Sequence, residues 1–222
     1  MLLHISTDRI IFINWGERII LPYGELEKNL PEFLYEHLPA KAGIDQGSRI
    51  TVVNGPGSFT NLRIATLALN TYNMLNNFCL DFVSVGKIDW YNKLYNDKMI
   101  KWRNDGTVKR YCVMYIGQKK NFWVADLERF AQGLGTREKG LGNTDGIIKL
   151  HVDDLKEYVE KLWDDWFVDE MVAEGKEMMD SVFGEGGYYI YSFTENDKMT
   201  EWQNDVVKLL EPNYMIEANI ES

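Results

Sequence analysis

The chain has 222 residues, enough for one large domain or two small ones, and 45% of them are hydrophobic, which supports a substantial core. Acidic residues (34) outnumber basic residues (24), so the net charge is −10. A protein that binds nucleic acid alone needs a basic surface, so we expect no direct nucleic-acid contact.

The cysteines and the start of the chain bear on the compartment. Cys79 and Cys112 make neither a disulfide framework nor a metal-ligand spacing. The first residues lack the basic start and long apolar stretch of a signal peptide. No run approaches the roughly 18 apolar residues of a membrane helix. We therefore predict a cytoplasmic protein that does not contact a membrane.

Apolar runs of β type and helical repeats of apolar residues alternate through the first half of the chain. The helix expected at 25–42 carries an apolar stripe that includes Phe33, and Pro31 should kink it or delay its start. The expected strands are 2–5, 9–15, 18–21, 50–53 and 82–85, and the expected helices are 25–42, 59–76 and 88–95.

Residues 96–107 are polar and glycine-containing, which is typical of a linker. We therefore place a lobe boundary there and predict lobes at 1–100 and 101–222, both of the α/β class. Residues 132–146 are rich in glycine and charge and predict a loop. The second lobe is expected to hold a β-hairpin from 110–116 and 121–126, helices at 152–167 and 201–210, and a strand at 188–193.

The turn between the strand at 50–53 and the next helix reads Gly-Pro-Gly-Ser-Phe-Thr-Asn over residues 55–61. Its glycines allow a tight turn, and Ser58 is placed to cap the helix. Free N–H groups at a helix start suit an anion. However, the Walker pattern needs a Lys here and the dinucleotide pattern needs a glycine in place of Thr60. The chemistry leaves two roles: an anion cradle, or a turn that only docks the helix on the sheet.

The amino-acid sequence of this turn resembles the G-P-G-S-F-T-G-x-R-I signature of the TsaB (YeaZ) family of tRNA threonylcarbamoyladenosine biosynthesis proteins. Asn61 replaces the usual glycine, and it is the one departure in ten positions. Weaker similarities lie at 29–31 (Asn-Leu-Pro) and 211–215 (Glu-Pro-Asn-Tyr-Met). The matching signature residues are Gly55, Pro56, Gly57, Ser58, Phe59 and Thr60, followed by Leu62, Arg63 and Ile64.

The resemblance implies an actin-like/sugar-kinase-like (ASKHA) fold with two lobes, the second smaller and degenerate. It also implies a non-catalytic subunit that scaffolds and activates TsaD, the enzyme that transfers threonylcarbamoyl to a tRNA adenosine. A TsaE-like ATPase would join a larger complex, and the isolated chain would form a homodimer.

The helix expected at 59–76 has one broad apolar arc, ending at Leu75, that should face the sheet. A solvated opposite face would normally carry several charges, but Arg63 is its only one. Either the helix at 25–42 covers that face, or another protein does; the resemblance favours the partner. The predicted interface residues are Phe33, Arg63, Thr66, Leu67, Asn70 and Met74.

The chain lacks the residues that catalysis would need. Ser6 stands where the family has an acid on its first strand, and Gly117 replaces a second acid. His4, His37 and His151 lie far apart in sequence and form no metal motif. We therefore expect no catalytic residue, cofactor or metal.

Two enzymatic alternatives stay open. One is a divergent ASKHA phosphotransferase or acyltransferase that uses Asp8 and Asp126 as its acids. The other is a peptidase, because the family was once grouped with glycoproteases; the chain lacks the metal-binding and nucleophile motifs that a peptidase would use.

Overall fold

The structure is a computed structural model of the chain. It describes residues 1–6, 9–14, 17–22, 26–38, 48–55, 59–91, 110–115, 120–127, 147–161, 165–169, 173–191 and 206–212. The predicted linker at 96–107 and loop at 132–146 lie outside these residues. So do Asp8, Pro56, Gly57, Ser58 and Gly117.

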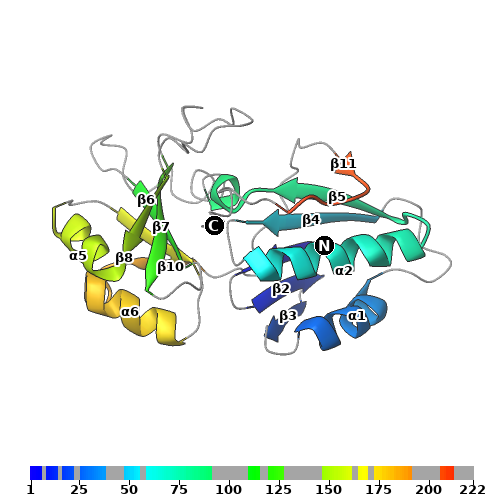
Figure 1. Ribbon diagram of the computed structural model, residues 1–222, viewed down its shortest axis with the longest axis horizontal. Helices are drawn as coiled ribbons and strands as arrows, with labels where there is room; N and C mark the ends of the chain where they lie inside the picture. The colour runs from blue at the N-terminus through cyan, green and yellow to red at the C-terminus, as the bar shows by residue number, and fades with distance from the viewer. Residues whose placement is uncertain are drawn as a thin grey trace, which may run out of the picture. The chain divides into compact units, whose positions relative to one another are not determined.

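The chain divides into two compact units, and the division is not a single cut (Figure 1). Unit 1 consists of Met1–Lys87 and Phe193–Asn213, whereas unit 2 consists of Ile88–Ser192 and Tyr214–Ser222. A late segment of the chain therefore belongs to the unit that the first residues build.

Unit 1 is built on a sheet of six strands in the order β11-β5-β4-β1-β2-β3. β1 pairs parallel with β4, and β4 pairs parallel with β5, while β2, β3 and β11 pair antiparallel with their neighbours. The strands are β1 (Leu2–Ile5), β2 (Arg9–Asn14), β3 (Glu17–Pro22), β4 (Ser48–Asn54), β5 (Leu80–Val85) and β11 (Val206–Val207).

Two helices of unit 1, α1 (Leu26–His37) and α2 (Phe59–Leu75), pack against each other. The predicted apolar stripe of α1 is buried, and Phe33 meets Phe12 of β2 edge-to-face with ring centroids 5.3 Å apart. Burying such a side chain contributes about 2 kcal/mol. α1 begins at Leu26 and continues through Pro31, so the late start that the sequence allowed is wrong.

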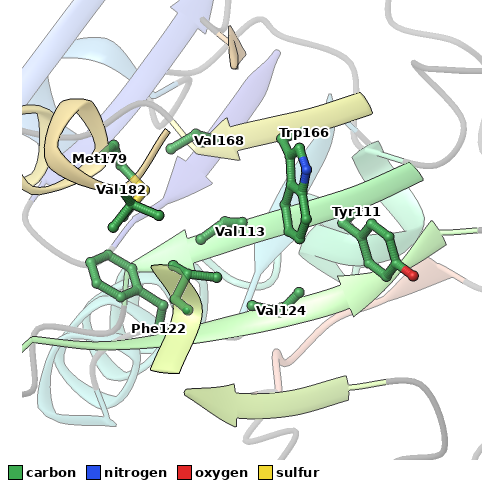
Figure 2. Packing of buried hydrophobic residues seen from close by; sticks show 9 residues of the cluster. Tyr111, Val113, Phe122, Val124, Trp166, Val168, Met179 and Val182 are labelled. Carbon is green, nitrogen blue, oxygen red and sulfur yellow. The ribbon is translucent and has the colours of Figure 1, made fainter. Parts of the chain in front are cut away.

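Unit 2 has a sheet of five strands in the order β10-β9-β6-β7-β8. Helices α5 and α6 pack together, and Figure 2 shows the apolar core, in which Tyr111 and Trp166 stack with centroids 4.8 Å apart. The elements are β6 (Arg110–Tyr115), β7 (Asn121–Asp126), β8 (Ile147–His151), α5 (Val152–Glu160), β9 (Asp165–Asp169), α6 (Ala173–Phe183) and β10 (Tyr189–Tyr191).

The two units repeat one connectivity. In each, three antiparallel strands are followed by helix, strand, helix and strand. The first strand of each unit (β1, β6) lies at the centre, with the second and third strands on one side and the parallel fourth and fifth on the other. The predicted α/β class is confirmed, with two mixed sheets.

Two predicted helices are wrong in part. The helix expected at 152–167 ends at Glu160, and 165–169 form strand β9 because alternate residues, Trp166 and Val168, enter the core. The helix expected at 201–210 is not helical from Val206 onward: β11 pairs with β5 instead. Residues 201–205 lie outside the described residues.

Candidate protein-interaction site

The glycine-rich turn begins with a backbone conformation that glycine suits. Gly55 has φ +67°, in the left-handed region, and it is buried at the end of β4. Its carbonyl accepts a hydrogen bond from the backbone N–H of Lys87 at 2.6 Å. Phe59 and Thr60 then open α2, and Thr60 is exposed. The described part of the turn thus joins β4 to α2 and bonds to Lys87.

One side of α2 exposes large apolar side chains. Leu67 is 70% exposed, Met74 is 56% exposed and Leu75 is 78% exposed. Phe78, just after the helix, is 40% exposed. Helical periodicity places Leu67 and Met74 on one face, together with the exposed Arg63, the only charged residue in α2. We call Arg63, Leu67, Met74, Leu75 and Phe78 the α2 stripe.

Helix α1 covers one flank of α2. The Tyr72 hydroxyl donates a hydrogen bond to the Leu38 carbonyl at 3.0 Å, and burial raises the pKa of Tyr72 to about 12. Tyr35 of α1 stays exposed, whereas Phe33 points into the core. Contact between the two helices therefore hides the Tyr72 side of α2 and leaves the α2 stripe open.

The other flank of α2 is covered by residues 206–212, which we call the C-terminal strap (Figure 1). Asn70 binds the strap twice: its Nδ2 donates to the Leu210 carbonyl at 2.9 Å, and its Oδ1 accepts from the Leu210 N–H at 2.8 Å. Asn73 donates to the Lys208 carbonyl at 2.8 Å, and Asn54 of β4 donates to the Glu211 carbonyl at 2.7 Å. Three asparagine amides thus hold the strap by its backbone.

The strap also supports the turn that ends α2. The Lys208 ammonium pairs with Asp81 at 2.5 Å and donates to the Phe78 carbonyl at 3.0 Å. Asn77 and Phe78 both have φ +55°, a conformation that costs a side-chain-bearing residue energy. The Phe78 N–H donates to the Asn73 carbonyl at 2.7 Å, which closes the turn.

The predicted interface residues separate into two groups. Arg63, Leu67 and Met74 are exposed on one face of α2. Thr66 (3% exposed) and Phe33 (6% exposed) are buried within the chain, and the Asn70 amide is occupied by the strap. The structure therefore narrows the predicted surface to the first group.

Sequence reasoning misplaced Leu75 and did not single out Asn73 or Phe78. Leu75 was expected to face the sheet and is exposed instead, because the helix ends there and the chain turns away at 76–78. Asn70 and Asn73 are three residues apart inside a helix, where asparagine is unfavourable. Two asparagines at that spacing indicate that their amides form hydrogen bonds with another segment of backbone.

Several residues weighed as catalytic candidates have structural roles where the chain is described. The Ser6 N–H donates to the Arg9 carbonyl at 2.9 Å, so Ser6 closes a hairpin turn, and its side chain is buried. His151 caps α5, accepting from the Asp153 N–H at 3.4 Å. His37 lies against Phe33. Within the described ranges, no three His, Cys, Asp or Glu side chains gather as metal ligands would. Asp126 ends β7.

The helices in the described part of the chain include none that is long and apolar enough to cross a membrane.

Comparison with known proteins gives a structural likeness only. No protein-family model matches the chain, and no curated protein matches it in sequence. Among solved structures, "YeaZ from Pseudomonas aeruginosa" matches with 16% identity and a TM-score of 0.38, covering 76% of this chain and 73% of that one. A second structure, titled an uncharacterized protein with similarity to peptidase YEAZ from Pseudomonas aeruginosa, matches with 16% identity and a TM-score of 0.36 over the same shares.

Proposed function

We propose that this protein is a TsaB-like, non-catalytic subunit of a tRNA-modification complex. It binds a TsaD-like catalytic subunit and holds it in an active arrangement. The observation that carries the proposal is the α2 stripe, which follows directly on the glycine-rich turn that resembles the TsaB signature. A large exposed apolar surface with one charge is typical of a protein interface rather than of a solvated helix.

The repeated connectivity of the two units supports the ASKHA assignment within this proposal. The resemblance implies two related lobes, and both units place their first strand centrally between antiparallel and parallel neighbours. The catalytic work belongs to the partner, which would also recruit a TsaE-like ATPase and the tRNA. The chain's net charge of −10 agrees with leaving the RNA contact to that partner.

The mechanism is burial of the α2 stripe against an apolar helix surface of the partner. A partner that buries Leu67 and Met74 removes their side chains from water, which contributes about 25 cal/mol per Å². Arg63, at the N-terminal end of the stripe, would select a partner carboxylate or carbonyl. In isolation, the same stripe would associate with a second copy of the chain.

Co-purification of the chain with the TsaD-like protein of the same genome tests this proposal. We expect Leu67→Asp and Met74→Asp each to abolish recovery of the complex while the variants keep their circular dichroism spectrum and melting temperature. Ile20→Asp is the control, since Ile20 is an exposed apolar residue (40%) that lies on β3, outside the α2 stripe. A complex that survives both α2 substitutions would overturn the proposed interface.

Calorimetry separates this proposal from the enzymatic alternative. The isolated chain is expected to show no heat of binding with ATP and magnesium, because Ser6 stands where the family has its acid. Clear stoichiometric binding would contradict the non-catalytic assignment and favour an ASKHA enzyme.

A further inference from the structure

The C-terminal strap and the turn after α2 share the residues that hold them. The Asn73 amide accepts from the Leu80 N–H at 2.9 Å and donates to the carbonyls of Leu80 at 3.1 Å and Lys208 at 2.8 Å. Lys208, from the strap, reaches back to the Phe78 carbonyl and to Asp81. The Asn73 side chain therefore bonds to the strap and to Leu80, the residue after the turn, and the Lys208 side chain bonds the strap to the turn itself.

The turn depends on such support because its backbone is unfavourable. Asn77 and Phe78 are consecutive residues in the left-handed region, where a phenylalanine is uncommon. Strained residues persist only when surrounding contacts over-determine them. Here the contacts are the Phe78 N–H bond to the Asn73 carbonyl and the Lys208 bond to the Phe78 carbonyl.

The turn in its observed conformation presents an exposed aromatic ring at the end of the α2 stripe. Phe78 lies three residues beyond Leu75, the last residue of α2, and its exposed side chain therefore lies at the C-terminal end of the α2 stripe. Leu209 of the strap is also exposed. The strap backbone on either side of Leu209 is bound to Asn70 and Asn73, which places Leu209 along the flank of α2.

We propose that the C-terminal strap is a clamp that fixes the turn at residues 76–79 and so positions Phe78 in the α2 stripe. Where it concerns binding, this inference rests on the proposed function. The α2 stripe with Phe78 in place binds the apolar face of the catalytic subunit. The affinity for that subunit is higher when the strap is attached than when it is detached. Thermodynamic linkage makes the effect reciprocal: the factor by which an attached strap raises the affinity for the partner equals the factor by which a bound partner favours attachment of the strap.

Cys79 provides a native reporter of the clamp, because it follows Phe78 and is half-buried. Burial raises the pKa of Cys79, and the Lys208 charge opposes that rise. Removing Lys208 therefore lowers the thiolate fraction and by electrostatics alone slows alkylation. Opening the turn exposes the thiol and speeds alkylation. The two effects have opposite signs, so the direction of the change identifies the cause.

The experiment is iodoacetamide labelling of the full chain in its native state, with Cys79 and Cys112 resolved by peptide mass spectrometry. We expect Lys208→Met to label Cys79 several-fold faster than the wild type, while the buried Cys112 is unchanged. Lys161→Met removes the same charge from an exposed pair with Glu157 on α5 and should leave the rate unaltered. Labelling that stays constant or slows in Lys208→Met overturns the clamp.

Hydrogen exchange of the same proteins provides a second measurement that needs no partner. In Lys208→Met, amide exchange should accelerate together in residues 76–80 and 206–212. Acceleration confined to 206–212 would show that the turn stands without the strap and would overturn the inference. Asn73→Ala should give the larger coupled change, provided its melting curve shows a folded protein.

Partner binding then separates this inference from the proposed function. If Leu67→Asp abolishes the complex, Lys208→Met is expected to weaken it by about tenfold, whereas Lys161→Met should not weaken it. A complex lost with Leu67→Asp but unchanged with Lys208→Met contradicts the clamp alone. A complex unchanged with Leu67→Asp contradicts the interface, and the labelling and exchange results still decide whether the clamp exists.

Discussion

Asn70 pairs with Leu210 as one strand pairs with another: its amide donates to the Leu210 carbonyl at 2.9 Å and accepts from the Leu210 N–H at 2.8 Å. Asn70→Ala removes both partners of a partly buried peptide group. We expect the free energy of unfolding to fall by about 1–3 kcal/mol. Urea denaturation followed by circular dichroism measures the loss.

Thr71→Ala is the control for that substitution, because Thr71 is the next residue on α2 and its side chain is exposed. Its effect should stay within about 0.5 kcal/mol of the wild type. Equal stabilities for the Asn70 and Thr71 variants would mean that the strap contributes nothing to the folded state.

Phe33 provides a test of which α1 residue belongs to the core. Phe33→Ala leaves a cavity beside Phe12 and His37 and should lower the free energy of unfolding by about 3–5 kcal/mol. Tyr35→Ala, from the exposed side of the same helix, should lower it by less than about 0.5 kcal/mol. Chemical denaturation compares the two, and a Tyr35 effect as large as that of Phe33 would contradict the assigned orientation of α1.

Phe78 combines an unfavourable backbone with an exposed ring, so replacing it should separate stability from binding. Glycine adopts φ +55° readily. Phe78→Gly is therefore expected to keep or raise the free energy of unfolding, by up to about 1 kcal/mol. It should nevertheless weaken the proposed complex, since the ring is lost. A variant that is destabilised by more than about 1 kcal/mol would show that the ring packs within the chain.

His4 makes stability depend on pH. Burial, followed by repulsion from Lys87, Arg18 and Arg9, holds the pKa of His4 well below its usual 6.5 in the folded state. Below pH 6.5 the unfolded chain therefore binds a proton that the folded chain does not. The free energy of unfolding should decrease as pH falls through this window, by up to about 1.4 kcal/mol per pH unit.

The measurement is the pH dependence of urea unfolding between neutral and mildly acidic pH, for the wild type and for His4→Gln. Carboxylates titrate in both proteins, so the difference between the two slopes isolates His4. The wild type should lose more stability than the variant on acidification. Parallel curves would contradict the assignment.

Local sequence patterns were sufficient for the elements of unit 1 that precede residue 88. The strands β1 to β5 and the helices α1 and α2 were predicted, since each has strong periodicity and its neighbours in the sheet come mostly from nearby sequence. Burial of the α1 stripe followed from its spacing. The exposure of Leu67 and Met74 agrees with the low charge of that face of α2.

The two wrongly predicted helices share one physical cause: a distant partner decides the local structure. Val206, Leu209 and Leu210 have helical spacing, but β5 and the amides of α2 offer the strap backbone better hydrogen-bond partners than its own carbonyls. Trp166 similarly falls within the helix expected at 152–167 and instead enters a sheet, together with Val168, as part of β9. Such competition is invisible to a window of neighbouring residues.

The placement of β11 on the edge of the first sheet has a consequence for biosynthesis. Unit 1 begins with the first residue, yet β5 receives its outer neighbour from residues 206–207. During translation, the strap is made only after all of 88–192. Asn70, Asn73 and the edge of β5 in the nascent unit 1 therefore stay uncovered for that time. We therefore expect the first unit to need chaperone protection during elongation, and ribosome profiling of chaperone-bound nascent chains should show occupancy that persists while the residues between β5 and the strap are synthesised.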